Sequence, residues 1–234
     1  MKSQAKQKVS EKQAFIEMID KVLLDLADFN RLSEKSLLNA RYYKHQETHE
    51  KRILSANIAL FKHYQDMQDY FNECSFKGKL GTYGKSQLAE TNQLRLDLLS
   101  LACLRFRVGD DPEAFKVKSK LITFMKTLSD FIETLTEFRK RKNTRPNLQL
   151  LERQLEVLIE AFYDAYPLDH EHEYEFELDT EELNDDLLLM DDEAVTLKYD
   201  DGHAALQGFI SGAHIALHDL AQLIAALEHW RGES

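Results

Sequence analysis

The amino-acid sequence predicts an all-α protein, an antiparallel bundle of five or six helices with an acidic insert before the last helix. Two observations predict this class. Along several long stretches, apolar residues recur at alternating spacings of three and four, which is the period of one face of an α-helix. The 234 residues include only three prolines and eight glycines, so long elements with short connections are expected.

Two helices are expected before residue 75, because no glycine or proline interrupts this part of the chain. Asn30 and Ser33 are candidate capping residues, which predicts a cap or kink there and a second helix over about 34–75. The first helix carries an apolar face: Phe15, Ile19, Val22, Leu26 and Phe29. The second carries a stripe of apolar residues and histidines: Tyr42, His45, His49, Ile53, Ala56, Leu60, His63, Met67 and Tyr70.

The third and fourth helices follow a glycine-rich stretch at 75–86. Ser86 is the expected N-cap of a helix over about 87–108. Asp111 followed by Pro112 is a typical helix start. The fourth helix has the most regular apolar period: Val117, Leu121, Phe124, Leu128, Phe131, Leu135 and Phe138. Because further apolar residues widen this face, a bundle is favoured over a free two-stranded coiled coil.

The last two expected helices enclose the acidic insert. One opens at Pro146 and ends at Tyr166, and the other starts near Asp201. Gly208 and Gly212 lie four residues apart near the start of the last helix, which permits close approach of another backbone. We therefore expect a helical bundle over 1–166, an acidic insert over 167–201 and a C-terminal helix over 202–234 that packs back on the bundle.

The negative charge of the protein is concentrated in one segment. Residues 169–201 contain 15 Asp and Glu residues against one Lys, a net charge of −14, so the rest of the chain carries +3 of the total of −11. Acidic residues alternate with Tyr174, Phe176 and Leu178 at 173–178, and 195–199 also alternates, which predicts a short β-hairpin. The same composition is typical of a mobile docking segment or of a plain acidic linker.

An acidic patch that bears aromatic side chains suits a protein partner with a basic surface, including another copy of this chain. The same charge repels nucleic acid, so direct nucleic-acid binding by this segment is not expected, although an ordered acidic face could imitate a phosphate backbone. The basic end of the fourth helix is a secondary candidate surface. The candidate partner-binding residues are Tyr174, Phe176, Leu178, Leu187, Met190, Tyr199, Arg139 and Arg141.

Two histidine pairs have metal-ligand spacing. His45 and His49, and likewise His214 and His218, lie four residues apart on expected helices, so both rings of each pair point the same way. If the two helices faced each other, the four histidines could form a metal site. The alternative interpretation is that they are hydrogen-bonded histidines at the edge of the core. A metal ion is the only cofactor that the sequence suggests.

Other features of the sequence limit the classes of function that are expected. The P-loop, GxSxG, HExxH and GxGxxG motifs are absent. Cys74 and Cys103 are isolated, and neither an uninterrupted apolar run of membrane-spanning length nor a secretory signal occurs, so a cytoplasmic protein is expected. The leading hypothesis is a non-catalytic interaction protein, such as an adaptor, regulatory or assembly subunit. The alternatives are a metal-binding bundle enzyme or sensor and an acidic inhibitor or mimic of nucleic acid.

Overall fold

The structure, a computed structural model, describes residues 2–38, 46–74, 78–107, 112–140, 146–166 and 201–231. These residues form the helices α1 (Lys2–Leu38), α2 (Gln46–Glu73), α3 (Lys79–Arg107), α4 (Pro112–Lys140), α5 (Gln149–Ala165) and α6 (Asp201–Arg231). The described part of the chain contains no strand, and the helices pack against one another, which confirms the predicted all-α bundle. The predicted hairpin lies outside the described residues.

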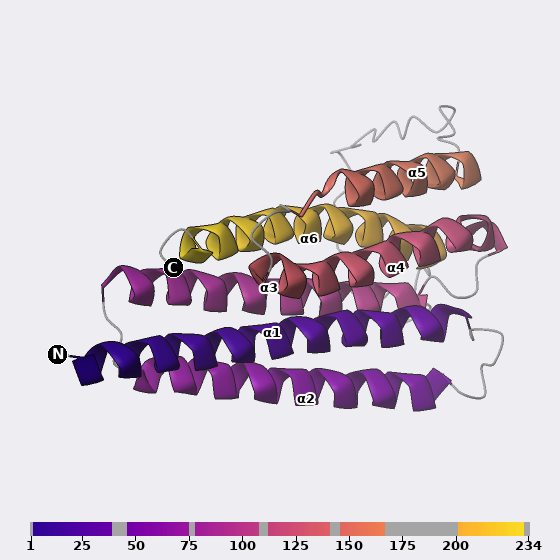
Figure 1. Ribbon diagram of the computed structural model, residues 1–234. Helices are drawn as coiled ribbons and strands as arrows, with labels where there is room; N and C mark the ends of the chain where they lie inside the picture. The colour runs from indigo at the N-terminus through magenta and orange to yellow at the C-terminus, as the bar shows by residue number, and fades with distance from the viewer. Residues whose placement is uncertain are drawn as a thin grey trace, which may run out of the picture.

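The helices form two layers in which consecutive helices run in alternating directions (Figure 1). The first layer is a row in the order α2, α1, α4 and α5. The second layer is the pair α3 and α6, which make the most extensive contact in the molecule. In this arrangement, α3 packs against α1 and α2, whereas α6 packs against α4 and α5. As a result, α2 and α5 are the end helices of the row, and each has one side that no other described helix covers.

The apolar faces predicted from spacing form the core. All five residues of the face predicted for the first helix are buried in α1, and all seven predicted for the fourth helix are buried in α4. In α6, the buried Phe209 ring meets the edge of the Phe124 ring of α4 at a centroid distance of 6.2 Å. Each fully buried large apolar side chain contributes about 1.5–3 kcal/mol to the free energy of unfolding, so these faces dominate the stability of the bundle.

The predicted cap at Asn30 and Ser33 is wrong, because α1 continues through both residues. The Asn30 side chain is buried and donates hydrogen bonds to the Met125 carbonyl at 2.7 Å and to the Ser129 hydroxyl at 2.8 Å on α4. Both bonds are donated by Nδ2, whereas Oδ1, the atom that would accept a capping hydrogen bond, is buried with no hydrogen-bond partner among the described residues. The second helix accordingly begins at Gln46 rather than near residue 34.

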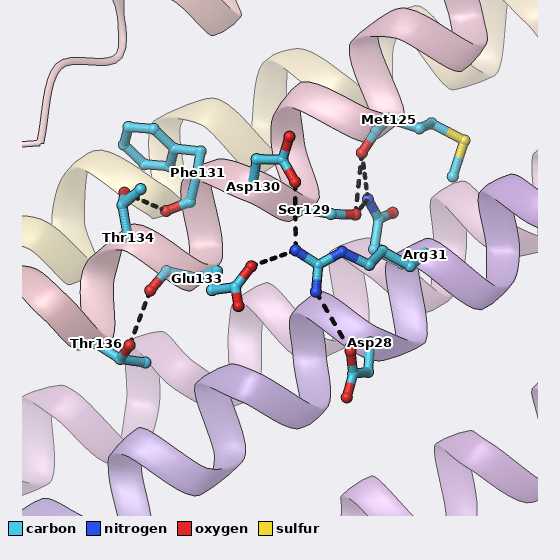
Figure 2. A network of polar contacts seen from close by, with 10 residues as sticks. Asp28, Arg31, Met125, Ser129, Asp130, Phe131, Glu133, Thr134 and Thr136 are labelled. Carbon is cyan, nitrogen blue, oxygen red and sulfur yellow. Dashed lines mark hydrogen bonds and ion pairs between the residues drawn. The ribbon is translucent and has the colours of Figure 1, made fainter.

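The same interface carries an exposed ion-pair cluster around Arg31, the residue that follows Asn30 in the sequence (Figure 2). The Arg31 guanidinium contacts Glu133, and it also contacts Asp130 at 3.2 Å and Asp28 at 3.4 Å. The hydrogen bond to Glu133 is the largest cause that raises the pKa of Arg31. Buried hydrogen bonds and exposed ion pairs therefore join α1 to α4 side by side.

The expected start of the third helix at Ser86 is also wrong, because α3 begins at Lys79 and includes two of the glycines. Gly84 is needed for packing rather than for breaking the helix. A Cβ atom at this position would lie 2.3 Å from Cε2 of the Phe71 ring on α2.

The fifth helix, α5, begins at Gln149 instead of Pro146. The Asn147 side chain, just before this helix, accepts a hydrogen bond from the Gln149 backbone N–H at 2.9 Å.

The paired glycines of α6 lie against α3, where leucine side chains rather than another backbone approach them. Cβ atoms added at Gly208 and Gly212 would lie 3.2 Å from Leu104 Cδ2 and 3.1 Å from Leu101 Cδ2, respectively, both on α3. The absence of side chains at these two positions lets the leucines of α3 pack directly on the α6 backbone.

Candidate interaction surface

Helix α2 carries two apolar faces and lies at the end of the row, where the described helices bury only one of them. The buried face packs on α1 and α3 and includes Ile53, Leu60 and Met67. The second face consists of Leu54, Ile58 and Phe61, which are 57%, 61% and 39% exposed. Spacings of four and three place these three side chains in one line along the helix. We call this line the outer stripe of α2.

Arg95 of α3 holds one end of the outer stripe in place. Its guanidinium carbon lies 4.8 Å from the centroid of the Phe61 ring, within range of a cation–π contact. The same group donates hydrogen bonds to the Asn57 side chain at 3.3 Å and to the Asn92 side chain at 3.2 Å. The Tyr64 ring is stacked with the Phe61 ring, and the two ring centroids are 6.4 Å apart.

Burial shifts the pKa of two groups in this contact. Arg95 is only 8% exposed, and desolvation lowers its pKa from the ordinary value, while the nearby Tyr64 opposes that change. Burial raises the pKa of the Tyr64 phenol, and the Arg95 charge opposes it. Arg95 starts from so high a pKa that it keeps its charge at neutral pH, so a buried cation lies directly beside the exposed apolar stripe.

The surface around the outer stripe is basic. Lys51, Arg52 and Lys62 are all exposed, and residues 51–65 contain no Asp or Glu. At about 100° per residue, Lys51 and Lys62 lie beside the stripe, whereas Arg52 lies on the far side of the helix; Arg95 of α3 lies beside Phe61. The combination of exposed apolar side chains and charge of one sign is typical of a surface that binds another molecule.

The opposite side of α2 forms a small hollow with α1. A cavity of about 230 Å³ lies between the helices because Ala56 and Ala59 are too small to fill the space. At its rim, the His63 ring Nδ1 lies 2.6 Å from the Asp25 carboxylate. The cavity is lined by Asp25, Asp28, Phe29, Leu32, Ala56, Ala59, Leu60 and His63. Both members of the His63–Asp25 pair are about one third exposed, so this pair joins the two helices at the surface.

A carboxyl cluster lies at the interface between α3 and α6. Asp97 is 8% exposed, and its Oδ1 accepts a hydrogen bond from the Gln93 side chain at 3.1 Å. Its Oδ2 is buried and receives no hydrogen bond from the residues that the structure describes. Burial, followed by the hydrogen-bonding contact with Asp219, raises the pKa of Asp97 to about 7. Burial and Asp219 also raise the pKa of Glu90, and His218 partly offsets this shift.

The predicted partner-binding residues are not placed by the structure. Arg139 lies in the last turn of α4, and its side chain is outside the described part. The remaining residues lie outside the described ranges: Tyr174, Phe176, Leu178, Leu187, Met190, Tyr199 and Arg141. Their role in binding stays a prediction from charge and composition.

The predicted histidine pairs are only partly placed. His214 and His218 are exposed on α6, His49 lies on α2 with its side chain outside the described part, and His45 lies outside the described ranges. Within those ranges, α2 and α6 do not contact each other. Among the residues with described positions, no group of three or more His, Cys, Asp or Glu could hold a metal ion. The four-histidine site stays a prediction.

Sequence reasoning missed the outer stripe of α2. The signal was present, because Leu54, Ile58 and Phe61 repeat the spacing of the buried face with an offset of one residue. Spacing alone does not show whether this second line is exposed, because another neighbouring helix could also bury it. Only the position of α2 at the end of the row shows that no described helix covers it.

Helix α6 is also notable for its composition. Over His203–His229 it is long and apolar enough to cross a membrane, judged by length and composition alone, and it is the one described helix that meets these criteria. A core helix of a bundle meets the same criteria. Along the outer side of α6, the exposed residues are mostly polar: Gln207, Ser211, His214, His218 and Gln222.

No protein-family model, no curated protein and no solved structure matches this chain. The evidence for a function therefore comes from the residues of the chain itself.

Proposed function

We propose that this chain is a non-catalytic helical-bundle interaction protein, an adaptor, regulatory or assembly subunit that binds a protein partner on the outer face of α2. The observation that carries this proposal is the exposure of Leu54, Ile58 and Phe61 in one line on an end helix. Anchors at positions i, i+4 and i+7 are the recognition pattern of a helix that packs on another helix or in a groove.

Leaving the apolar side chains of the outer stripe in water costs free energy. A large apolar side chain gains about 1.5–3 kcal/mol when it is fully buried, and neither α1 nor α3 provides that burial for Leu54 and Ile58. A partner that covers the stripe recovers this free energy. The stripe is thus suited to binding and contributes little to the stability of the free bundle.

The surroundings of the stripe favour binding because they are already ordered. The contact of Arg95 with Phe61 and its hydrogen bond to Asn57 hold the α3 side of the stripe. The buried face of α2 fixes the helix on α1. Since the binding residues lie on a rigid helix, less conformational entropy is lost when a partner binds.

The acidic segment at 169–201 supports the same class of function from the sequence. Its net charge of −14 and its aromatic residues suit a second contact with a basic protein surface. We propose that it adds to the α2 contact rather than replaces it, since the two surfaces carry opposite charge.

The test compares Ile58→Asp on α2 with Leu150→Asp on α5. These residues are 61% and 58% exposed, so the two substitutions are matched in chemistry and in burial. Tagged full-length protein is isolated from its native cell, and the proteins that copurify are quantified after thermal melts confirm that both variants are folded. We expect Ile58→Asp to lose a partner that the parent protein and Leu150→Asp retain. Equal recovery with both variants would refute the proposal.

A further inference from the structure

The charges that border the outer stripe of α2 specify the chemistry of the partner, an inference that rests on the proposed function. Successive residues of an α-helix are about 100° apart around its axis. Lys51 and Lys62 therefore lie along the same side of the stripe, and both are exposed. Arg95 lies on the opposite side, where α3 brings its guanidinium over Phe61. Both borders of the stripe are cationic.

No acidic side chain interrupts this arrangement over the length of the stripe. Residues 51–65 contain Lys51, Arg52 and Lys62 but no Asp or Glu; Glu50 directly precedes this stretch and Asp66 directly follows it. Arg95 is only 8% exposed, so its charge is poorly screened by water and salt. A partner group of opposite charge therefore gains more from Arg95 than from a fully solvated cation.

The chemistry of the borders argues against a second copy of α2 as the occupant. A symmetric dimer would place the same surface on both sides of the contact. Two outer stripes paired around Ile58 would then bring Lys51 and Lys62 of both copies to one interface. Like charges across an interface repel each other and disfavour that pairing.

We propose that the outer stripe of α2 binds an amphipathic helix of a different protein, one whose apolar line is bordered on both sides by Asp or Glu. Leu54, Ile58 and Phe61 supply the apolar contact, and Lys51, Lys62 and Arg95 select the acidic borders. The apolar contact provides affinity, whereas the charges provide specificity and orientation.

The test uses two fluorescent model peptides of about 18 residues, a length that forms stable helix on a surface. Both carry a leucine line at spacings of four and three. One has Glu and the other Lys at every border position. Binding to the full-length chain is measured by fluorescence anisotropy. We expect the Glu peptide to bind about tenfold more tightly than the Lys peptide, a preference of the size that a few surface charge pairs supply, and to weaken as salt is added.

Three variants test whether the peptide binds at the outer stripe. Ile58→Asp should abolish binding of the Glu peptide, and Leu150→Asp should leave it unchanged. Lys62→Glu should reduce the preference for the Glu peptide severalfold, because it removes one exposed cation and adds an anion. Equal binding of the two peptides, failure of the Glu peptide to bind, or insensitivity to Lys62→Glu would each overturn the inference.

Two further experiments test whether the bound helix belongs to a different protein. Self-association of the full chain in sedimentation, lost in Ile58→Asp, would assign the surface to a second copy. A synthetic peptide of residues 169–200 that binds as tightly as the Glu peptide and is displaced by it would assign the surface to this chain's own acidic segment. Either result would overturn the choice of a different protein. Loss of the native partner in Ile58→Asp, combined with equal binding of both model peptides, would refute the acidic borders but retain the proposed function.

Discussion

The carboxyl groups of Asp97 on α3 and Asp219 on α6 lie within hydrogen-bonding range of each other inside the most extensive helix contact of the bundle. Two charged carboxylates this close repel each other, so protonation of Asp97 is favoured. Burial of Asp97 and the proximity of Asp219 raise the pKa of Asp97 to about 7, from an ordinary value of 3.8. The Asp97 carboxyl is therefore partly protonated at neutral pH, inside the contact between α3 and α6.

This proton makes the stability of the bundle pH-dependent. Between the unfolded pKa near 3.8 and the folded pKa of about 7, the native state binds more protons than the unfolded state. The contribution of Asp97 is therefore fully present at low pH and is lost as pH rises towards 7. The shift corresponds to at most about 4 kcal/mol of unfolding free energy. Asp97→Asn, which keeps a donor towards Asp219 at every pH, should remove most of this slope. Urea denaturation from about pH 5 to pH 8 measures it.

The matched control for this experiment is Asp66→Asn on the exposed side of α2, which should retain the slope of the parent protein. A slope that is the same in Asp97→Asn and in the parent protein would show that other groups account for the pH dependence.

Asn30 and Arg31 are adjacent in sequence but should differ in their contributions to stability (Figure 2). Asn30→Ala removes two buried hydrogen bonds and leaves the Met125 carbonyl with one bond fewer, so we expect a loss of about 2 kcal/mol. Arg31→Ala breaks ion pairs whose acidic partners are 49–75% exposed, so we expect a loss of about 1 kcal/mol or less. Denaturation in low salt and in about 1 M NaCl separates them. Only the Arg31→Ala effect should shrink in high salt; the opposite order would contradict these assignments.

Gly84 should tolerate a methyl group less well than Gly212. Gly84→Ala gains about 1 kcal/mol of helix propensity, but its Cβ would lie 2.3 Å from the buried Phe71 ring, which must move. Overpacking of this kind costs about 1–3 kcal/mol, so a net loss is expected. At Gly212 the nearest atom is a flexible leucine methyl at 3.1 Å, and Ala should be nearly neutral. Thermal melts test this difference, and Phe71→Leu should reduce the cost of Gly84→Ala.

Replacement of residues 169–200 by a Gly/Ser linker of equal length tests the acidic segment. We expect the helical signal in circular dichroism to remain nearly unchanged, because the described core does not draw on these residues. The net charge of the protein should become positive, and recovery of the native partner should fall. Unchanged recovery would show that the acidic segment has no part in binding.

Much of the fold could be predicted because it follows from local spacing. The apolar lines of α1 and α4 are buried as predicted, since a helix can hide only the face that its sequence makes apolar. The errors have tertiary causes. Asn30 resembles a cap until α4 supplies its hydrogen-bond partners, and Gly84 resembles a helix breaker until Phe71 packs against it.

The candidate surface was harder to predict than the core. Whether Ile58 is buried or exposed depends on which helix lies next to α2, and spacing along one chain does not contain that information. The contact of Arg95 with Phe61 joins residues on different helices, so no sequence motif reports it. The pair Asp97 and Asp219 was hidden for the same reason, because its two members lie far apart in sequence.

The central claim is that the outer stripe of α2 touches a partner in the cell. Its most direct test is site-specific photo-cross-linking in the native cell, with a photoreactive amino acid in place of Ile58 and, as a control, in place of the similarly exposed Tyr163 on α5. The account predicts one discrete cross-linked protein at position 58 that is absent at position 163. It also predicts that Lys62→Glu weakens this cross-link. An identical pattern at both positions, or no cross-link at position 58, would contradict it.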